Sequence, residues 1–253
     1  MPTTMNLKTA TILAGAMLSV AGFTQAFAAE AMIPAAISAA VADAVRPPAD
    51  KERDANRKPA ETVAFAGVKP GMIVGELGPG GGYYTRILSK TVGPKGKVYA
   101  LVSKAQAARP GGLDAINTLA ATLGNVTVLT VDYPSLALPE KADLFWTTEN
   151  YHDYHNGPTA NVPGLNKAVF NNLKPGGIFY VEDHSAAPGA GVEAANTVHR
   201  MDEAVAKKEL ADAGFKIDAE GTILKNPKDD RTKRMNEAGN FLTDRFMLRL
   251  KRP

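Results

Sequence analysis

The strongest constraint on the fold is the alternation of short apolar strand patterns with helical patterns between residues 72 and 213. Each strand pattern is bounded by Gly, Pro or acidic residues, and most of the intervening stretches are long enough for a helix. Strands joined by helical crossovers pair in parallel, with helices on both faces of the sheet. We therefore expect a doubly wound α/β fold. The predicted parallel strands cover residues 72–77, 97–102, 126–131, 142–148 and 178–181.

The C-terminal part departs from this alternation. Residues 194–213 predict one long helix that ends at Gly214, and two further strands are predicted over 215–225 and 241–250. Because a charged loop joins these two strands without a helical pattern, they are expected to pair antiparallel. The whole sheet is thus expected to be seven-stranded and mostly parallel, with an antiparallel C-terminal pair.

The N-terminal segment has the pattern of a secretory signal peptide. Lys8 precedes an apolar run over 10–22, and small residues at Ala26 and Ala28 form an A-x-A exit. We expect a signal peptide over 1–28 and export, to the periplasm. The alternative is that this segment stays uncleaved and acts as a membrane anchor. No later segment is apolar enough to span a bilayer.

The remaining chain divides into an Ala- and Pro-rich arm over 29–49 and one domain over 50–253. Within that domain, residues 50–67 predict a helix that is interrupted near Pro59. We expect the arm to be a loose tether, because Pro47 and Pro48 close it.

Composition excludes several functional classes. The 29 Lys and Arg residues exceed the 26 Asp and Glu residues by only three, which argues against a nucleic-acid partner. The sequence contains no cysteine. Disulfides, thiolate metal sites and a cysteine nucleophile are therefore excluded.

A glycine-rich segment follows the first predicted strand. Gly78, Gly80 and Gly82 form a G-x-G-x-G pattern, and a helix is predicted to begin at Tyr83. Ligands bind at the carboxyl ends of strands in such sheets, and glycine lets the backbone approach a ligand closely. The dinucleotide fingerprint needs glycine where Tyr83 stands, and no P-loop lysine is in register. The segment favours a small nucleoside-like ligand with a carboxylate end. The alternative is a tight turn without a ligand.

Two segments of the chain resemble those of a known family. Residues 74–85, VGELGPGGGYYT, are similar to motif I of the class I S-adenosylmethionine-dependent methyltransferases, and residues 173–177, LKPGG, resemble the turn before their fifth strand. The chain more narrowly resembles a group of exported predicted methyltransferases. That group carries a helix with two arginines and a proline, which correspond here to Arg53, Arg57 and Pro59. It also carries an Asn-Tyr-His-Asp segment, here residues 150–153, and an Asp-His pair, here residues 183–184.

The resemblance implies a Rossmann-like methyltransferase fold with S-adenosylmethionine as cofactor. It implies that the three glycines contact the methionine part, that Glu76 orders the loop, and that Asp132, beside Tyr133, lies near the adenine. It places Thr148, Glu149 and Asn150 near the sulfonium and the substrate. One departure matters: the second strand ends in Ser103, where the family has an acidic residue that binds the ribose. Ser103 is the expected, weaker replacement.

Histidines follow the fourth and fifth predicted strands. His152 and His155 come after the fourth strand, and Asp183 and His184 end the fifth. A methyl acceptor loses a proton during transfer, and a neutral imidazole suits that task. We therefore predict His152 and His184 as candidate bases, with Asp183 orienting a ring. His155 is equally well explained as a polar loop residue.

The same cluster offers a metal-binding alternative. Two histidines, Asp183 and Glu149 would suit a divalent ion. However, His152 and His155 lie in a predicted loop, and no H-E-x-x-H motif occurs. We assign no metal at this point.

Two functions from different classes remain open. The first is an S-adenosylmethionine-dependent methyltransferase with a small-molecule acceptor. The second is an exported, non-catalytic module on the same scaffold that binds a small ligand or a metal. Export favours the second, because S-adenosylmethionine is a cytoplasmic metabolite. Neither interpretation includes stable membrane insertion after the leader is cleaved.

Overall fold

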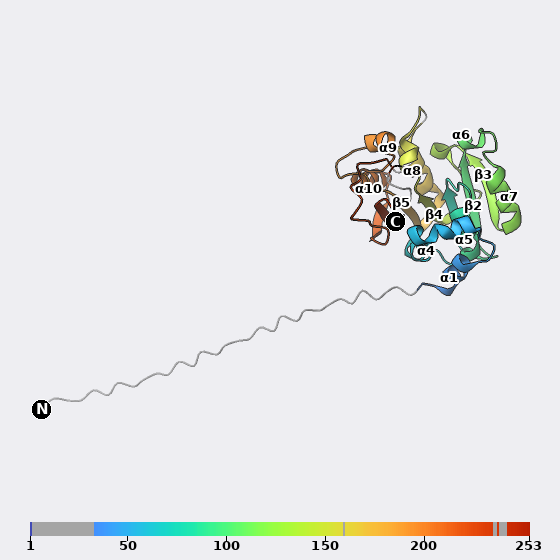
Figure 1. Cartoon of the computed structure of the whole chain (residues 1–253), viewed down its shortest axis with the longest axis horizontal. Coiled ribbons are helices and arrows are strands. Elements are labelled where there is room, and N and C mark those ends of the chain that lie inside the picture. Colours follow the sequence, from blue (N-terminus) through green and yellow to red (C-terminus); the bar gives the residue numbers. More distant parts are fainter. Residues whose placement is uncertain (2–32, 159, 235–236, 238–241) are drawn as a thin grey trace. The chain divides into compact units, whose positions relative to one another are not determined.

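The computed structural model describes residues 1, 33–158, 160–234, 237 and 242–253. Residues 33–253 form one compact unit (Figure 1). The predicted signal peptide over 1–28 lies, apart from Met1, outside the described residues. No helix in the described ranges combines the length and the apolarity that crossing a membrane requires.

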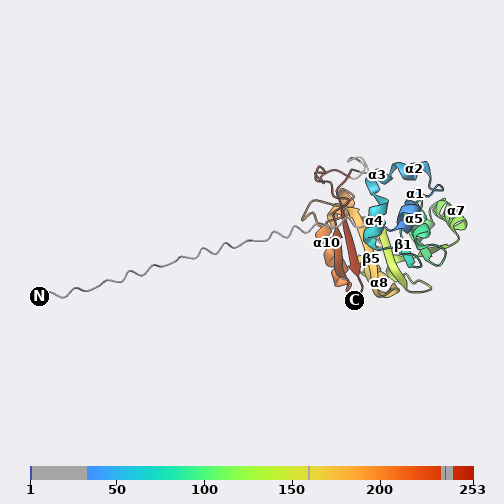
Figure 2. The ribbon, with the colours of Figure 1, turned by 90° about the horizontal axis from the view of Figure 1, so that it is seen from below.

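A seven-stranded mixed sheet forms the centre of this unit (Figure 2). The strand order is β3-β2-β1-β4-β5-β7-β6, and β7 alone runs antiparallel to its neighbours β5 and β6. The α/β fold predicted from the sequence, with its antiparallel C-terminal pair, is thereby confirmed. The strands are β1 (Ile73–Leu77), β2 (Lys97–Ser103), β3 (Val126–Val131), β4 (Ala142–Thr148), β5 (Leu173–His184), β6 (Lys216–Gly221) and β7 (Arg245–Lys251).

Helices and short 3₁₀ turns connect the strands. N-terminal to β1 lie α1 (Ala35–Ala42), α2 (Pro48–Glu52), α3 (Asp54–Arg57) and α4 (Pro59–Ala66). The crossovers between β1 and β5 contain α5 (Tyr83–Val92), α6 (Lys104–Ala107), α7 (Asp114–Leu123), η1 (Tyr133–Ser135), η2 (His152–His155) and α8 (Val162–Asn172). Between β5 and β6 lie α9 (Glu193–Thr197) and α10 (Glu203–Asp212).

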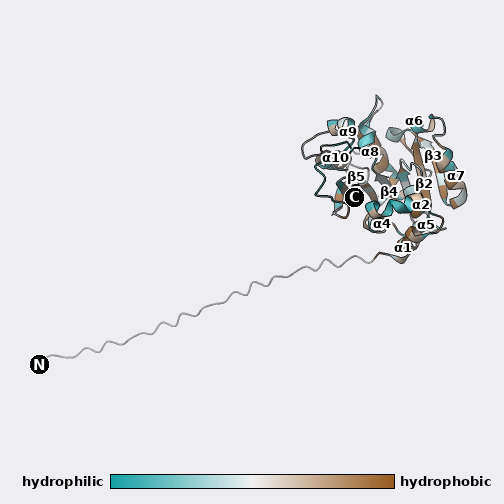
Figure 3. Ribbon diagram, in the orientation of Figure 1, coloured by the Kyte–Doolittle hydropathy of each residue, from teal (hydrophilic) through white to brown (hydrophobic). Residues whose placement is uncertain are grey.

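Both faces of the sheet are buried, which explains the continuous apolar runs of the parallel strands. Successive residues of β4 show this, because Phe145 belongs to one core cluster while Leu144 and Trp146 belong to the other. Helices α8 and α10 contribute to the first cluster, and α1, α4, α5 and α7 to the second. The hydropathy colouring in Figure 3 shows the apolar strands enclosed by helices that carry hydrophilic residues.

The long helix predicted over 194–213 is wrong. The structure has two helices, α9 and α10, separated by residues 198–202. His199 adopts a left-handed conformation with φ 58°, which no α-helix tolerates in its interior. The break also allows Met201 to form an isolated parallel β-bridge with Ser185, just after the end of β5.

Part of the predicted loose arm is ordered. Residues 35–42 form α1, which packs against α5, and Ile37 and Ala40 are buried. Arg46 is also buried, and its guanidinium binds the Asp54 carboxylate at 2.6 Å. The alanine-rich composition concealed a helix whose small residues pack closely against the domain.

Candidate cofactor site and the histidine cluster

The glycine loop, residues 78–82, links the carboxyl end of β1 to the first turn of α5. Gly78, Gly80 and Gly82 have φ values of 62°, 54° and 85°, which side-chain-bearing residues rarely adopt. A Cβ on Gly80 would meet no described atom within 4 Å, whereas one on Gly82 would lie 2.2 Å from Leu119 Cδ2. Gly80 therefore faces open space, and Gly82 allows the loop to pack against α7.

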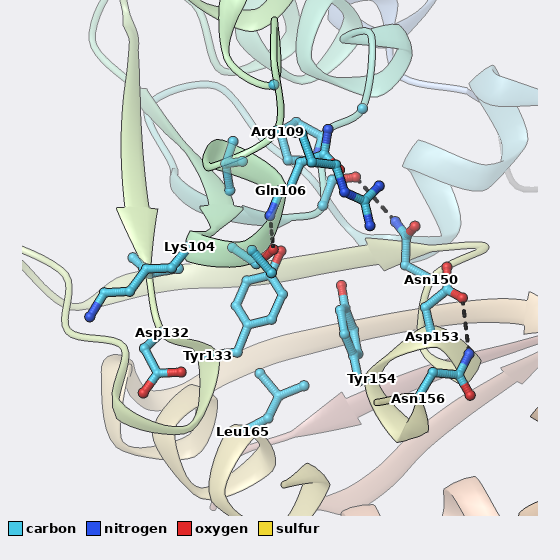
Figure 4. Close-up of a pocket in the computed structure, with 18 of the residues that line it drawn as sticks. Lys104, Gln106, Arg109, Asp132, Tyr133, Asn150, Asp153, Tyr154, Asn156 and Leu165 are labelled. Carbon is cyan, nitrogen blue, oxygen red and sulfur yellow. Dashed lines mark hydrogen bonds between the residues drawn. The ribbon is translucent and has the colours of Figure 1, made fainter. Parts of the chain in front are cut away.

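A cavity of about 1060 Å³ opens beside the glycine loop (Figure 4). Residues from the carboxyl ends of β1, β2 and β3, and from the segment after β4, line it. Drug-sized ligands occupy pockets of roughly 300–1,000 Å³, so a nucleoside with an amino-acid side arm fits. The lining includes Gly78, Gly80, Ser103, Lys104, Gln106, Arg109, Asp132, Tyr133, Asn150, Asp153 and Tyr154.

A second, smaller cavity of about 190 Å³ touches the same loop. It shares Asn150 and residues 78–81 with the larger cavity. Its other walls bring charged residues of α2 and α3 against the end of β4. The lining residues that this cavity does not share with the larger one include Asp50, Arg53, Arg57, Glu76, Tyr83 and Glu149.

Glu149 connects the N-terminal helices to the sheet. It forms ion pairs with Arg57 of α3 and, at 2.8 Å, with Arg245 of β7. Arg245 also lies 3.2 Å from Glu182, whose carboxyl is fully buried. Burial raises the pKa of Glu182 to about 7, although the Arg245 charge opposes this. Next to Glu149, Asn150 donates a hydrogen bond from Nδ2 to the Gly78 carbonyl at 3.1 Å and so supports the glycine loop.

Glu76 supports the loop from below. Its side chain is buried, and its carboxylate accepts a hydrogen bond from Thr85 Oγ1 of α5 at 2.6 Å. Burial raises the pKa of Glu76 to about 7, and the Thr85 hydroxyl offsets only part of that shift. Glu76 thus ties β1 to α5 on either side of the glycine loop, and its role at a cofactor site stays a prediction.

Ser103 has a structural partner at the end of β2. It is the N-cap of α6, and its Oγ accepts a hydrogen bond from the Gln106 backbone N–H at 3.1 Å. The hydroxyl hydrogen is still available for donation to a ligand. Figure 4 shows Lys104, Gln106 and Arg109 along the same wall of the cavity. The end of β2 therefore carries a helix cap followed by the basic side chains of Lys104 and Arg109.

Two tyrosines form the wall on the β3 and β4 side. The rings of Tyr133 and Tyr154 meet edge to face at 5.1 Å, and Figure 4 shows both between Asp132 and Asn150. Tyr133 also donates a hydrogen bond to the Leu101 carbonyl at 3.1 Å. Such fixed aromatic surfaces suit a flat heterocycle such as a purine.

The histidine cluster consists of His152, Asp153, Asp183, His184 and His199. The segment after β4 meets the carboxyl end of β5 here. Asp183 accepts hydrogen bonds from His152 Nδ1 at 2.8 Å and from the backbone N–H groups of His152 and His184 at 2.7 and 2.8 Å. His184 Nδ1 lies 2.6 Å from Thr243 Oγ1.

The candidate bases His152 and His184 lie behind the cavity wall. Each is only 1% exposed, and neither lines the two cavities described above. Asp153 is the connection, since it lines the larger cavity and its Oδ1 lies 3.5 Å from His152 Nε2. The catalytic roles of His152, His184 and Asp183 stay predictions.

The environments of the two rings differ. Burial lowers the pKa of His184 to about 4. Burial also acts to lower the pKa of His152, but the charge and hydrogen bond of Asp183 outweigh it and leave the pKa raised. Asp183 itself has a lowered pKa, because its partners, His152 first among them, overcome its burial.

Sequence reasoning predicted Glu149 but missed its ion pairs, and it missed several other residues of this region. Glu149 lies 92 and 96 positions from its partners Arg57 and Arg245, and no local pattern signals those pairs. His199 was placed inside a helix, yet its ring lies 4.4 Å from that of His152. Ser103 is a typical helix N-cap residue, and this signal could have located α6. The cavity residues Lys104, Gln106 and Arg109 follow it directly.

No protein-family model matches the sequence, and no curated protein matches it. Solved structures do match its fold. A SAM-dependent methyltransferase from Aquifex aeolicus has a TM-score of 0.58 and 21% identity, covering 82% of this chain and 94% of its own. A second one, from Mesorhizobium loti, has a TM-score of 0.56 and 17% identity, covering 79% of this chain and 100% of its own.

The chain has the Rossmann-like methyltransferase fold. At these identities the likeness concerns the fold alone. The [4+2]-cyclase SpnF shares it as well, with a TM-score of 0.56, 15% identity and coverage of 81% of each chain. Because one fold can carry different activities, the function has to be argued from the site.

Proposed function

We propose that this protein is an S-adenosylmethionine-dependent methyltransferase that acts on a small-molecule acceptor. The observation that carries the proposal is Gly80, which has a left-handed backbone and faces a cavity of about 1060 Å³ at the carboxyl end of β1. Any side chain at this position would enter the space that a ligand needs. The methyltransferase fold of the chain supports the same conclusion.

The lining residues fit the chemical groups of the cofactor. The nucleoside would lie with its sugar edge toward Ser103 and its base toward Asp132 and the Tyr133 ring. The amino-acid end would reach the smaller cavity, where Arg53 carries a positive charge and Asp50 a negative one. The amino-acid end is a zwitterion, so its carboxylate and ammonium groups match this pair of charges. Asn150 borders both cavities and Glu149 borders the smaller one, and both would face the sulfonium.

When bound, S-adenosylmethionine supplies a methyl group on a cationic sulfur. The protein's part is to align an acceptor with that methyl and to remove the acceptor proton. The larger cavity has room beside the nucleoside, next to Asp153 and Tyr154. We infer that the acceptor lies there, where the buried His152–Asp183 pair is reached through Asp153.

Calorimetric titration tests this proposal. We expect S-adenosylmethionine and S-adenosylhomocysteine to bind at one site with a dissociation constant well below about 1 mM, a free energy beyond roughly −4 kcal/mol. Absence of saturable binding at millimolar concentration would contradict the proposal. Incubation with methyl-labelled S-adenosylmethionine and a small-molecule extract then tests transfer of the label.

A non-catalytic ligand-binding module is the alternative, and one observation favours it. The Ser103 hydroxyl already accepts a hydrogen bond from Gln106, and no carboxylate stands at this position to hold a ribose. This alternative predicts saturable binding of a small ligand without methyl transfer. Binding of S-adenosylmethionine accompanied by formation of S-adenosylhomocysteine and a labelled product would eliminate it.

We also propose that the protein is exported, on the strength of the signal-peptide pattern over residues 1–28. Expression of the full chain, cell fractionation and N-terminal sequencing test this. The expected mature protein begins at Ala29 and is found outside the cytoplasm. Intact protein with Met1 retained in the cytoplasmic fraction would contradict it.

A further inference from the structure

Three members of the histidine cluster converge on one point. His152 and Asp153 belong to η2, and His199 lies between α9 and α10. One ligand atom from each of the three residues lies within 4.8 Å of the others. Asp153 Oδ1 is 3.5 Å from His152 Nε2 and 3.4 Å from His199 Nε2.

His152 is held in place with one nitrogen unpaired. Its Nδ1 binds the Asp183 carboxylate at 2.8 Å, which fixes the ring and turns Nε2 toward Asp153. The side chain is 1% exposed, and Nε2 has no hydrogen-bond partner among the described residues. A buried polar atom without a partner is destabilising, so its retention calls for a ligand.

The separations match those within a metal coordination sphere. Zinc–nitrogen and zinc–oxygen bonds are about 2.0–2.2 Å long, and tetrahedral geometry then puts neighbouring ligand atoms about 3.4 Å apart. The two distances to Asp153 Oδ1, 3.5 and 3.4 Å, already have this length. Asp183 supplies the carboxylate that metal-bound histidines commonly engage through their other nitrogen.

The chain directly after His199 is anchored to the end of β5. The Met201 N–H donates to the His184 carbonyl at 2.8 Å, and the buried Arg200 donates from Nη1 to the Ser185 carbonyl at 3.0 Å. These bonds hold His199 in its left-handed conformation against the general preference of non-glycine residues. The imidazole is thus presented to His152 by a fixed segment and not by a free loop.

We propose that His152, Asp153 and His199 bind a divalent transition-metal ion, with Asp183 orienting His152. Two imidazoles and one carboxylate favour a borderline ion such as Zn²⁺ over Mg²⁺ or Ca²⁺, which prefer oxygen ligands. Three protein ligands leave a further coordination position for water or for an oxygen of a bound molecule. Because Asp153 lines the larger cavity, the ion lies at its wall. Metal binding occupies the nitrogen that His152 would need as a base.

Metal-free protein without an affinity tag provides the test, with Zn²⁺ in calorimetry and Co²⁺ as a spectroscopic probe. We expect one ion per chain and the visible absorption of low-symmetry four-coordinate Co²⁺. His199→Asn and Asp153→Asn should each weaken Zn²⁺ binding at least tenfold. Asparagine tolerates the left-handed conformation at position 199, and both side chains are partly exposed, so the folded domain should survive. Asp183→Asn should weaken binding by about 10–100-fold through His152.

Two controls separate this site from adventitious binding. His155→Gln removes a histidine outside the triad and retains a donor toward Glu209, and Asp230→Asn removes an exposed carboxylate. Neither should change Zn²⁺ affinity. Anomalous diffraction at the zinc edge should place one peak between His152, Asp153 and His199. The proposal is overturned if Zn²⁺ does not bind saturably up to about 1 mM, if His199→Asn and Asp153→Asn leave the affinity unchanged, or if the peak lies elsewhere.

Discussion

The glycine loop and the histidine cluster follow strands of the same sheet, but they are built in opposite ways. The loop exposes backbone to a cavity, and its conformation follows from glycines at three alternate positions. The cluster brings together side chains from three separate segments, and its members His152, Asp183 and His184 are buried. The first region is prepared for a ligand by the absence of side chains, and the second by hydrogen bonds that fix its side chains. Substitutions in the loop should therefore weaken cofactor binding, whereas the loss of a buried hydrogen-bonding group in the cluster should lower stability.

The largest expected effect is on the loop. Gly80→Val should weaken S-adenosylhomocysteine binding at least about 1000-fold, roughly 4 kcal/mol, because the side chain enters the open space over residue 80. Gly124→Val is the matched control, since Gly124 has φ 71° and equally open surroundings but lines neither cavity. Both variants should lose similar stability, and Gly124→Val alone should keep its affinity. Equal affinities in calorimetry would remove the loop from the site.

The corresponding test of the cluster is Asp183→Asn. Both Asp183 oxygens accept hydrogen bonds from N–H groups, so an amide nitrogen in either position would oppose a donor. We expect a loss of about 3–5 kcal/mol in the free energy of unfolding, measured by denaturant titration. Asp218→Asn, a partly exposed partner of Arg249, should change it by less than about 1 kcal/mol. Similar values for the two variants would mean that the cluster is not held by Asp183.

Glu76, which supports the glycine loop, gives a pH-dependent prediction. Burial raises the pKa of Glu76 from its ordinary value of 4.5 to about 7, so the folded state retains a proton that the unfolded state releases. Glu76 should therefore contribute a fall in the free energy of unfolding, on the order of 3 kcal/mol in total, as pH rises from about 5 to 7. Glu182, whose pKa is also raised to about 7, should add to this fall, and His184, whose pKa is lowered to about 4, should oppose it. Glu76→Gln should therefore make the free energy of unfolding fall less steeply than in the wild type across that range.

A control separates burial from the removal of a carboxylate. The pKa of Glu140 is lowered, chiefly by its hydrogen bond with Lys97 at the surface. Glu140→Gln should therefore retain the wild-type slope between pH 5 and 7. A Glu76→Gln variant with the wild-type slope would show that Glu76 does not hold the extra proton.

The smallest effect is expected at the edge of the cavity. Ser103→Ala should cost about 1 kcal/mol of stability through the lost N-cap and weaken S-adenosylhomocysteine binding about fivefold through one lost hydrogen bond. Asp202→Ala removes the N-cap of α10, away from both cavities, and should leave the affinity unchanged. Indistinguishable affinities for the two variants would exclude a ligand contact by Ser103.

The contrast also explains what could be predicted from the sequence. The strands of the parallel sheet and the glycine loop were predicted because their signals are local: apolar runs, punctuating glycines and a helix start. The cluster was only half predicted. His152, Asp183 and His184 follow strand ends, whereas His199 lies in a helical pattern that tertiary contacts interrupt. The Arg57–Glu149–Arg245 ion pairs depend on long-range packing alone.

A crystal structure of the protein grown with millimolar S-adenosylhomocysteine tests the central claim most directly. The account predicts the nucleoside over residues 78–81, with its sugar edge toward Ser103, its base toward Asp132 and its amino-acid end toward Arg53. A cavity closed by the protein's own side chains, or a ligand bound away from the glycine loop, would contradict it.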